Sequence, residues 1–279
     1  MPSFFKLSGA GNDFIALIGP APVPTEEDIR RWCRRALSLG ADGVLLLYRT
    51  ADGGRLVHHN ADGGRSDLCL NGSRCAAQLA FAQGWGRDGW LLLTTDAGIL
   101  EARQLNPNTV ELSLPLDLPT APERLQLEAD GALHEGWYLH VGVPHLVLDW
   151  PTTLTDAPVA SLGARLRSHP RILPGGANVN FVRFISPDRF EIRTFERGVE
   201  GETLACGTGV IATVQTGIAA GRLRLPVRAL TSGGFELTVS GDWKDGIWER
   251  LALAGDARLV ARGELLPGAS ELPDAPRWT

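Results

Sequence analysis

The chain has 279 residues, of which 44% are apolar and 21% charged, and its net charge is −5 at pH 7. This length suits about two globular domains, and the composition is ordinary for folded proteins. Because the chain is acidic and has no block of lysine and arginine, we expect neither nucleic acid nor a membrane as its main partner. No apolar run reaches the roughly 18 residues of a membrane span, and we expect no signal peptide. Four cysteines are too few for a disulfide scaffold, so we expect a reduced, cytoplasmic protein.

The first predicted element is a helix over residues 26–39. Thr25 is a suitable N-cap, Gly40 is a suitable end, and apolar residues recur on one face between them. Alternating apolar and polar residues further along the chain predict half-buried antiparallel strands, at 109–114, 190–195 and 235–239. Helices are fewer than strands, which indicates a mixed fold.

Two further predicted helices, over 72–82 and 209–220, are almost free of charge. Arg74 is the only charged residue in either of them. Small and apolar residues surround each helix on nearly every side, a pattern typical of a helix buried inside a domain. The sequence therefore predicts one buried helix among strands in each half of the chain.

Both buried helices begin with the same short motif. Cys69-Leu70-Asn71-Gly72 opens the first helix, and Cys206-Gly207-Thr208-Gly209 opens the second, 137 residues later. This repeat predicts two similar α/β halves related by a pseudo-twofold axis. The proline-rich stretch 115–122 is the expected linker between them.

A cysteine at a helix entrance has distinctive chemistry. The positive end of the helix dipole favours the thiolate, and the first backbone N–H groups point outward, ready to bind a carboxylate. Two such sites suit a reaction in which one thiolate removes a proton and the opposite thiol supplies one. The sequence contains no motif of a serine hydrolase, a phosphate loop or a zinc protease that would favour another chemistry.

The other candidate groups favour structural roles. Cys33 and Cys75 are typical small core residues. The sequence has neither a Cys-x-x-Cys pair nor a zinc-ligand spacing, so we expect no metal. His58 and His59 are adjacent, and since side chains alternate along a strand, both cannot point into one site. We therefore expect packing or surface positions for these two histidines.

Six blocks between residues 9 and 209 carry a resemblance to a known family. They are Gly9-Ala10-Gly11-Asn12-Asp13-Phe14, Asn60-Ala61-Asp62-Gly63-Gly64, Cys69-Leu70-Asn71-Gly72-Ser73-Arg74-Cys75, Gly142-Val143-Pro144-His145, Asn178-Val179-Asn180-Phe181 and the stretch 196–209. In this order they resemble the diaminopimelate epimerases. Six ordered blocks are far more specific than any single motif, and they cover most of the chain.

The resemblance implies an α/β fold of the α+β type with two pseudo-symmetric domains. Each domain would be a mostly antiparallel sheet wrapped around a central buried helix, with the active site in the cleft between the domains. The last strand, about 257–265, would return to the first domain. The expected domains are therefore 1–117 with about 257–270, and 118–256.

The same resemblance implies an isomerase that needs no cofactor and interconverts LL- and meso-2,6-diaminopimelate. This reaction serves the synthesis of lysine and of peptidoglycan precursors. The substrate would be a small amino acid, and the family implies a homodimer.

The roles of individual residues also follow from the resemblance. Cys69 and Cys206 match the two acid–base cysteines, and Glu196 and His145 match groups near the reacting amino group. Substrate binding, in which Glu196 also takes part, would use the backbone amides of Leu70, Asn71, Gly207 and Thr208 and the side chains of Asn12, Asn60, Asn178 and Arg197. The amides would hold the carboxylate at the reacting carbon, where negative charge develops as the proton leaves.

Three positions depart from the family pattern. Leu70 replaces the usual glycine after the first cysteine, Val143 replaces a frequent asparagine, and Gly43 replaces a glutamine that contacts substrate in some members. The last two changes remove polar partners for the far end of the substrate. A racemase of another amino acid, such as histidine, is therefore an alternative, and a non-enzymatic thiol–disulfide switch or binding protein is another.

Overall fold

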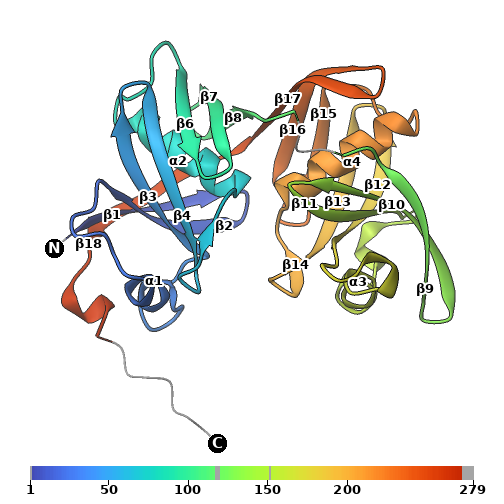
Figure 1. The fold of residues 1–279 in the computed structure, drawn as a ribbon, viewed down its shortest axis with the longest axis horizontal. Helices are drawn as coiled ribbons and strands as arrows, with labels where there is room; N and C mark the ends of the chain where they lie inside the picture. Colours follow the sequence, from blue (N-terminus) through green and yellow to red (C-terminus); the bar gives the residue numbers. More distant parts are fainter. Residues whose placement is uncertain (1, 117–119, 151, 272–279) are drawn as a thin grey trace, which may run out of the picture. The chain divides into compact units, whose positions relative to one another are not determined.

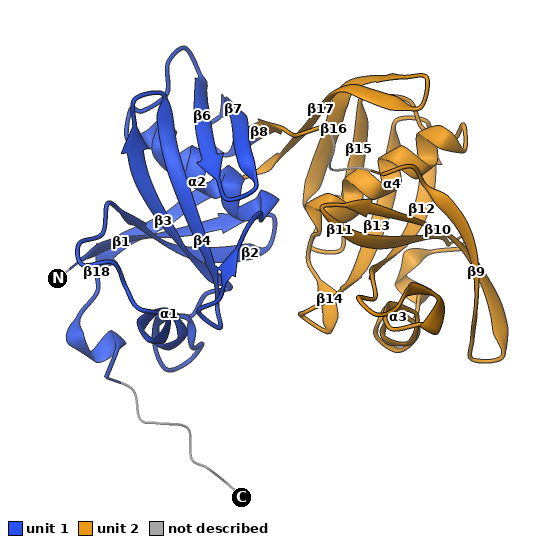
Figure 2. Ribbon diagram, viewed as in Figure 1, with its two compact units in different colours: residues 1–110, 257–279 blue, residues 111–256 orange. Residues whose placement is uncertain are grey.

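The computed structural model describes residues 2–116, 120–150 and 152–271. The chain forms two compact units, residues 1–110 with 257–279 and residues 111–256 (Figure 2). Each unit combines a largely antiparallel sheet with few helices (Figure 1), which confirms the predicted α+β class. The predicted domain boundary at residue 117 falls on residues 117–119, which lie outside the described part of the chain.

The first unit surrounds one buried helix with strands. Its elements are β1 (Ser3–Gly9), β2 (Asn12–Ile18), α1 (Glu26–Cys33), β3 (Gly43–Thr50), β4 (Gly53–Asn60), β5 (Arg65–Ser66), α2 (Leu70–Ala82), β6 (Trp90–Thr95), β7 (Gly98–Asn106), β18 (Arg258–Glu264) and η3 (Pro267–Ala269). β1 pairs antiparallel with both β2 and β18, so the last strand of the chain joins the first unit. α2 contacts most of these strands, which makes it the centre of the unit.

The second unit has a closely similar set of elements. They are β8 (Thr109–Ser113, starting in the first unit), β9 (Glu123–Ala129), β10 (Ala132–Val141), β11 (Val143–Asp149), η1 (Leu154–Asp156), α3 (Val159–Arg167), η2 (Pro170–Ile172), β12 (Asn178–Ser186), β13 (Arg189–Glu196), β14 (Gly201–Thr203), α4 (Gly207–Ala219), β15 (Val227–Thr231), β16 (Glu236–Lys244) and β17 (Ile247–Asp256). The three strands predicted from alternation correspond to β8, β13 and β16.

The two units follow the same path. β2 and β3 run parallel with α1 between them in sequence, as β11 and β12 do with α3. β4 and β6 are parallel on either side of α2 in sequence, as β13 and β15 are on either side of α4. The strands that follow each other directly pair antiparallel, such as β3 with β4 and β12 with β13. This shared path confirms the internal repeat predicted from the two cysteine motifs.

The two uncharged helices are buried, as predicted. In α2 every residue from Leu70 to Ala80 is buried, and in α4 every residue from Gly209 to Gly217 is buried. Both helices begin two residues earlier than the pattern indicated, because the cysteine itself is the N-cap. Each thiol therefore lies at the entrance of a helix whose body forms the core of its unit.

The prediction for α1 was right at its start and wrong at its end. The Thr25 hydroxyl accepts the N–H of Asp28, and the Asp28 carboxylate accepts the N–H of Thr25, a complete capping box. The helix ends at Cys33 instead of residue 39, and Ala36 has a φ of +65°. The chain then folds back so that the N–H of Gly40 reaches the Trp32 carbonyl at 2.9 Å. This turn leads directly into β3, a tertiary requirement that the apolar spacing did not reveal.

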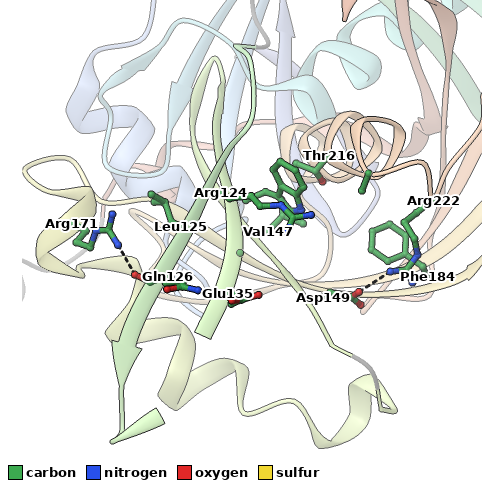
Figure 3. A pocket seen from close by; sticks show the side chains of 13 residues that line it. Arg124, Leu125, Gln126, Glu135, Val147, Asp149, Arg171, Phe184, Thr216 and Arg222 are labelled. Atoms are coloured by element: carbon green, nitrogen blue, oxygen red, sulfur yellow. Dashed lines mark hydrogen bonds and ion pairs between the residues drawn. The ribbon is translucent and has the colours of Figure 1, made fainter. Parts of the chain in front are cut away.

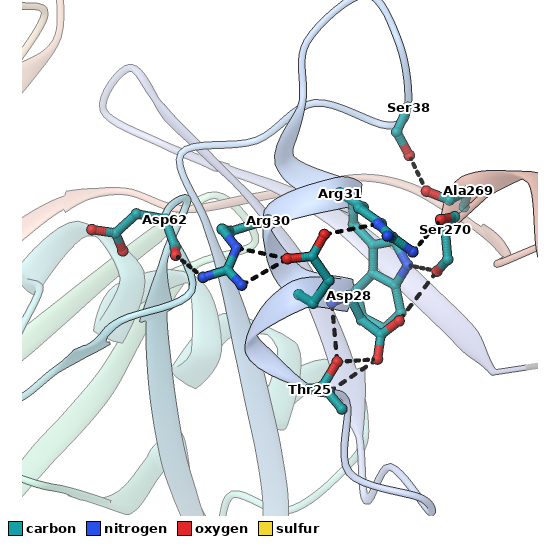
Figure 4. Close-up of polar contacts among 10 residues, drawn as sticks. Thr25, Asp28, Arg30, Arg31, Ser38, Asp62, Ala269 and Ser270 are labelled. Atoms are coloured by element: carbon teal, nitrogen blue, oxygen red, sulfur yellow. Dashed lines mark hydrogen bonds and ion pairs between the residues drawn. The ribbon is translucent and has the colours of Figure 1, made fainter. Parts of the chain in front are cut away.

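The segment after β18 packs on α1, as Figure 4 shows. The indole Nε1 of Trp32 donates to Oγ of Ser270 at 2.9 Å, and Arg31 donates to the Ser270 carbonyl at 2.9 Å. Ser38 donates to the Ala269 carbonyl at 3.0 Å. These bonds tie the end of the described chain to the first helix of the same unit and to the turn that follows it.

Candidate functional site

The entrance of α2 holds the first predicted reactive thiol. Cys69 is half-buried, and its Sγ accepts a hydrogen bond from the N–H of Gly72 at 3.4 Å. Leu70 and Asn71 form the first turn of the helix, whose N–H groups provide a site for an anion. The side chain of Leu70 is buried in the unit. This departure from the family pattern therefore adds its bulk to the core.

A chain of side-chain amides positions this first turn. The fully buried Arg74 donates to Oδ1 of Asn71 at 2.6 Å, and Nδ2 of Asn71 donates to Oδ1 of Asn12 at 2.8 Å. Nδ2 of Asn12 donates in turn to the Asp42 carboxylate at 3.0 Å. Both ends of the Asn12 carboxamide therefore bind protein groups, and Asn12 positions the side chain of Asn71 in the first turn of α2.

The amide chain ends in a cluster of charged side chains. Arg35 donates to Asp42 at 2.7 Å and to Asp13 at 2.5 Å, and Lys6 lies 2.6 Å from Asp13. Burial raises the pKa of Asp13, but the hydrogen bonds from Arg35 and Lys6 outweigh it, so this pKa lies below its usual value. Asp13 therefore stays ionised at neutral pH, and Arg35 joins it to Asp42, the carboxylate that binds Asn12.

The entrance of α4 is more enclosed. Cys206 is buried, and its Sγ lies 3.4 Å from the Thr208 hydroxyl. A Cβ on Gly209 would lie 2.3 Å from Oδ1 of Asn180 and 3.4 Å from the thiol. Only glycine therefore lets Asn180 approach the first turn so closely.

Asn180 is the centre of a buried polar network. Its Nδ2 lies 3.1 Å from the Leu146 carbonyl and 3.2 Å from Nδ1 of His145, and its Oδ1 accepts the Thr194 hydroxyl at 3.0 Å. Because an amide nitrogen only donates, Nδ1 of His145 accepts and Nε2 carries the proton. Burial, followed by the charge of Arg197, lowers the pKa of His145 to about 3. The imidazole is therefore neutral near pH 7 and offers an N–H at Nε2.

Three further predicted residues lie where β12 begins and β13 ends. The Asn178 side chain accepts the backbone N–H of Arg197 at 2.8 Å, which positions the loop after β13. The Glu196 carboxylate accepts the Thr203 hydroxyl at 2.8 Å. The guanidinium of Arg197 donates to the Gly175 carbonyl at 3.2 Å. The Thr203 hydroxyl therefore helps to position Glu196, while a backbone carbonyl orients Arg197.

The remaining predicted contact lies at the end of β4. Asn60 is exposed and opens a turn in which its N–H reaches the Gly64 carbonyl at 2.8 Å. Directly across the ladder lies Gly43, the first residue of β3. Val143, the third departure from the family pattern, is the first residue of β11.

The predicted residues fall into two groups, one in each unit. The first group contains Cys69, Leu70, Asn71, Asn12 and Asn60. The second group contains Cys206, Gly207, Thr208, His145, Asn178, Glu196 and Arg197. Within each group, the entrance of the buried helix lies beside strands that follow the same path in both units.

The sequence analysis missed a pair of buried glutamines. Gln78 in α2 donates to the Pro107 carbonyl at 2.7 Å, and Gln215 in α4 donates to the Thr120 carbonyl at 2.6 Å. They are 137 residues apart, as the two cysteines are, so the repeat in the sequence carried a signal for them. Each glutamine ties the buried helix to a segment near the boundary between the units.

A cavity of about 600 Å³ lies in the second unit, and none of the predicted site residues lines it. Figure 3 shows its lining from β9, β10, β11 and the end of α4. Arg222 pairs with Asp149 at 2.9 Å, and Arg171 donates to the Gln126 carbonyl at 2.7 Å, so protein groups already bind these arginines. The cavity lies at the C-terminal end of α4, whereas Cys206 lies at the N-terminal end.

The described residues also bear on metal sites and on membrane-spanning helices. Among the residues that the structure describes, no group of three or more His, Cys, Asp and Glu side chains could hold a metal ion. Within the same ranges, no helix has both the length and the apolar character needed to cross a membrane.

Comparison with known sequences agrees with the resemblance that the six sequence blocks carry. Residues 137–258 match the family model of diaminopimelate epimerase. The diaminopimelate epimerase of Aquifex aeolicus is 33% identical to this chain over 276 residues, which cover 94% of this chain and 97% of the relative.

Comparison with solved structures shows a shared fold. A phenazine biosynthesis protein of the PhzF family from Enterococcus faecalis has a TM-score of 0.70 at 17% identity, covering 95% of this chain and 99% of its own. A hydroxyproline epimerase from Agrobacterium vitis has a TM-score of 0.66 at 16% identity, covering 94% and 91%. The fold thus occurs in a phenazine biosynthesis protein as well as in an epimerase.

Proposed function

This chain belongs to the diaminopimelate epimerase family, and we propose that it interconverts LL- and meso-2,6-diaminopimelate by proton transfer between two cysteines. The observation that carries the proposal is the matched pair of thiols. Cys69 and Cys206 are each the N-cap of a buried helix, in units that follow the same path. The reaction is an isomerisation, and its product serves the synthesis of lysine and of peptidoglycan precursors.

The proposed chemistry needs both thiols at one substrate carbon. One thiolate takes the α-proton, so a C–H bond breaks and an S–H bond forms. The opposite thiol then gives its proton to the other face of the carbon, and its sulfur becomes the thiolate. No electron acceptor is needed, since the proton count and the oxidation state are unchanged. We accordingly propose that the reaction needs no cofactor and no metal.

The helix entrances would stabilise the charge that develops during this transfer. In the proposal, the amides of Leu70, Asn71, Gly207 and Thr208 bind the carboxylate next to the reacting carbon. Backbone donors that are already oriented stabilise a developing anion without reorganisation. The amide chain behind Asn71 supports this arrangement, because it binds the first turn of α2. In the second unit, Asn180 packs closely against Gly209 in the first turn of α4.

The remaining residues would recognise the amino groups and the far end of the substrate. Glu196 carries the charge that suits an ammonium group, and Arg197 suits a carboxylate at the far end. Asn60 and Asn178 would complete the recognition of that end. The neutral His145 would act as a hydrogen-bond donor through Nε2, and Asn12 would contribute through Asn71.

We also propose that the protein forms a homodimer and is located in the cytoplasm. Both rest on the family. Size-exclusion chromatography with light scattering tests the first, and fractionation of the source cells tests the second.

Proton NMR of LL-diaminopimelate with reduced protein in deuterium oxide tests the reaction directly. We expect loss of the α-proton signal and appearance of the meso isomer, with no cofactor added. Exchange of another amino acid, such as histidine, without exchange of diaminopimelate would instead establish a racemase with a changed substrate. If no amino acid exchanges while the protein is folded and its thiols are reduced, the enzymatic proposal is wrong.

A further inference from the structure

His58 is a buried polar residue that the proposed chemistry does not use. It lies within β4, between Leu45 of β3 and Ser66 of β5, and only 6% of its surface is exposed. Within the described part of the chain, neither ring nitrogen has a hydrogen-bond partner. Buried polar groups are nearly always paired, because an unpaired one loses its bonds to water without replacement. The unpaired imidazole therefore lowers the free energy of unfolding. A buried residue that lowers stability in this way is a candidate for a functional role.

The second unit shows what a purely structural solution looks like. In that unit the cross-strand pair Asn180 and Thr194 occupies the position that Leu45 and His58 occupy in the first unit. Thr194 donates to Asn180 at 3.0 Å, whereas Leu45 offers His58 no polar atom. A polar residue at this strand position can therefore find a hydrogen-bond partner on the neighbouring strand. In the first unit the neighbouring side chain is apolar, and His58 finds none there.

Gly43 provides the space in which the ring lies. A Cβ on Gly43 would lie 2.9 Å from Nε2 of His58 and 2.5 Å from the backbone oxygen of His59. A larger residue at this position would therefore displace the imidazole. The absence of a side chain at Gly43 therefore makes room for the buried ring of His58.

The ring lies on the face of the sheet that carries Asn60. His58 and Asn60 are two residues apart on β4, so their side chains point to the same face. The edge of Phe14 meets the imidazole at 5.8 Å between ring centres. A Cβ on Gly72, in the first turn of α2, would lie 3.5 Å from that same Phe14 ring. His58 is therefore one aromatic ring away from the predicted anion site and beside Asn60.

We infer that His58 is a specificity-determining residue, whose unpartnered ring nitrogen accepts a hydrogen bond from the ammonium group at the far end of the substrate. This inference rests on the function proposed above. Burial, with a smaller contribution from His59, lowers the pKa of His58 to about 4, so the ring is neutral at neutral pH. A neutral imidazole keeps a lone pair, which suits a cation better than a carboxylate.

Two substrates and one isosteric variant test the inference. LL-Diaminopimelate has a far ammonium group, and L-2-aminopimelate lacks it but keeps both carboxylates. For His58→Phe we expect kcat/KM for α-proton exchange to fall about 10- to 100-fold with diaminopimelate and less than about threefold with 2-aminopimelate. Because phenylalanine removes the unpaired nitrogens and keeps the ring, Tm of the free protein rises by about 2–4 °C.

His59→Phe is the matched control. Its side chain points to the opposite face of β4, where Nδ1 lies 2.9 Å from the Gly63 carbonyl. Because His59→Phe leaves the ring of His58 in place, we expect the ratio of the two kcat/KM values to stay that of the unmodified protein. If His58→Phe folds poorly, His58→Leu removes the same nitrogens, and the same change of ratio is expected.

The possible results separate this inference from the proposed function. Absence of exchange with diaminopimelate in the unmodified protein contradicts the function itself. Activity in the unmodified protein with an unchanged substrate ratio in His58→Phe contradicts only the role of His58. Equal losses with both substrates, together with a lower Tm, show a structural role and also overturn the inference.

Discussion

The two helix entrances have the same path and the same cysteine, yet their surroundings differ. At α2, a chain of amides runs from Arg74 through Asn71 and Asn12 to the charged cluster at Asp42. At α4, the thiol is buried near a network of neutral groups around Asn180. The fold therefore dictates where the thiol lies, whereas the residues on the neighbouring strands determine how it is supported.

Because of this difference, we expect the two units to respond differently to amino-acid substitution. Asn180 pairs with Nδ1 of His145 and with the Thr194 hydroxyl, so removing this centre leaves those buried groups without their partner. The first unit instead leaves His58 without a partner and ends its amide chain in charged groups. The second unit should therefore be more sensitive to substitution, and the first should be more adaptable to the substrate.

The largest expected effect is the loss of either thiol. Cys69→Ser and Cys206→Ser should each lower the rate of epimerisation about 10³-fold or more, because a hydroxyl is a far weaker acid–base group. Chiral chromatography of the product from one pure isomer measures this. Cys33→Ser is the matched control, since that buried cysteine lies in α1 and contacts neither entrance, and it should keep its activity. Full activity in either of the first two variants contradicts the two-thiol chemistry.

The next effect concerns the centre of the neutral network. Asn180→Leu gives the second unit the residue type that the first unit has at Leu45, but it leaves Thr194 and His145 without a partner. We expect the free energy of unfolding to fall by about 3 kcal/mol, from two or three orphaned groups. Urea denaturation measures this value. An unchanged midpoint would show that the network contributes little, and that the two units do not differ in this respect.

Two glycines at equivalent positions give a sharper comparison. Gly209→Ala places a Cβ 2.3 Å from Asn180, whereas Gly72→Ala places one 3.3 Å from Leu45 and 3.5 Å from Phe14. We expect the first variant to lose about 2 kcal/mol of stability and the second less than about 1, since alanine also favours the helix. Thermal unfolding of the two proteins side by side is the measurement. Equal losses would show that the two entrances are packed alike.

The smallest effect is a dependence of stability on pH. The pKa values of His58 and His145 are lowered from 6.5 to about 4 and about 3, so below pH 6.5 the unfolded chain binds protons that the folded chain does not. Stability therefore falls as the pH falls, by about 1 kcal/mol for each histidine between pH 7 and pH 5.5. His58→Phe should remove about half of this combined histidine contribution. Urea denaturation at the two pH values tests the expectation, and an undiminished pH dependence in the variant contradicts it.

Much of the site could be predicted from local patterns. The N-cap of α1, the burial of α2 and α4 and the repeat of the cysteine motif follow from residues that are close in sequence, because capping and periodicity are local properties. The end of α1 could not be predicted, since the turn at Ala36 serves the entry into β3. The role of Asn180 was not recognised either, because its partners His145 and Thr194 are 35 and 14 residues away.

The sequence by itself determined the mixture of strands and a few helices, the two buried helices and the two cysteines at their entrances, because these depend on residue type and spacing along one segment. It also determined that His58 and His59 point to opposite faces, since side chains alternate along a strand. Only the tertiary structure decided that His58 lies buried over Gly43 beside Leu45, without a polar partner. Whether a polar group is satisfied depends on atoms that separate segments bring within hydrogen-bond distance, and no local pattern specifies those atoms.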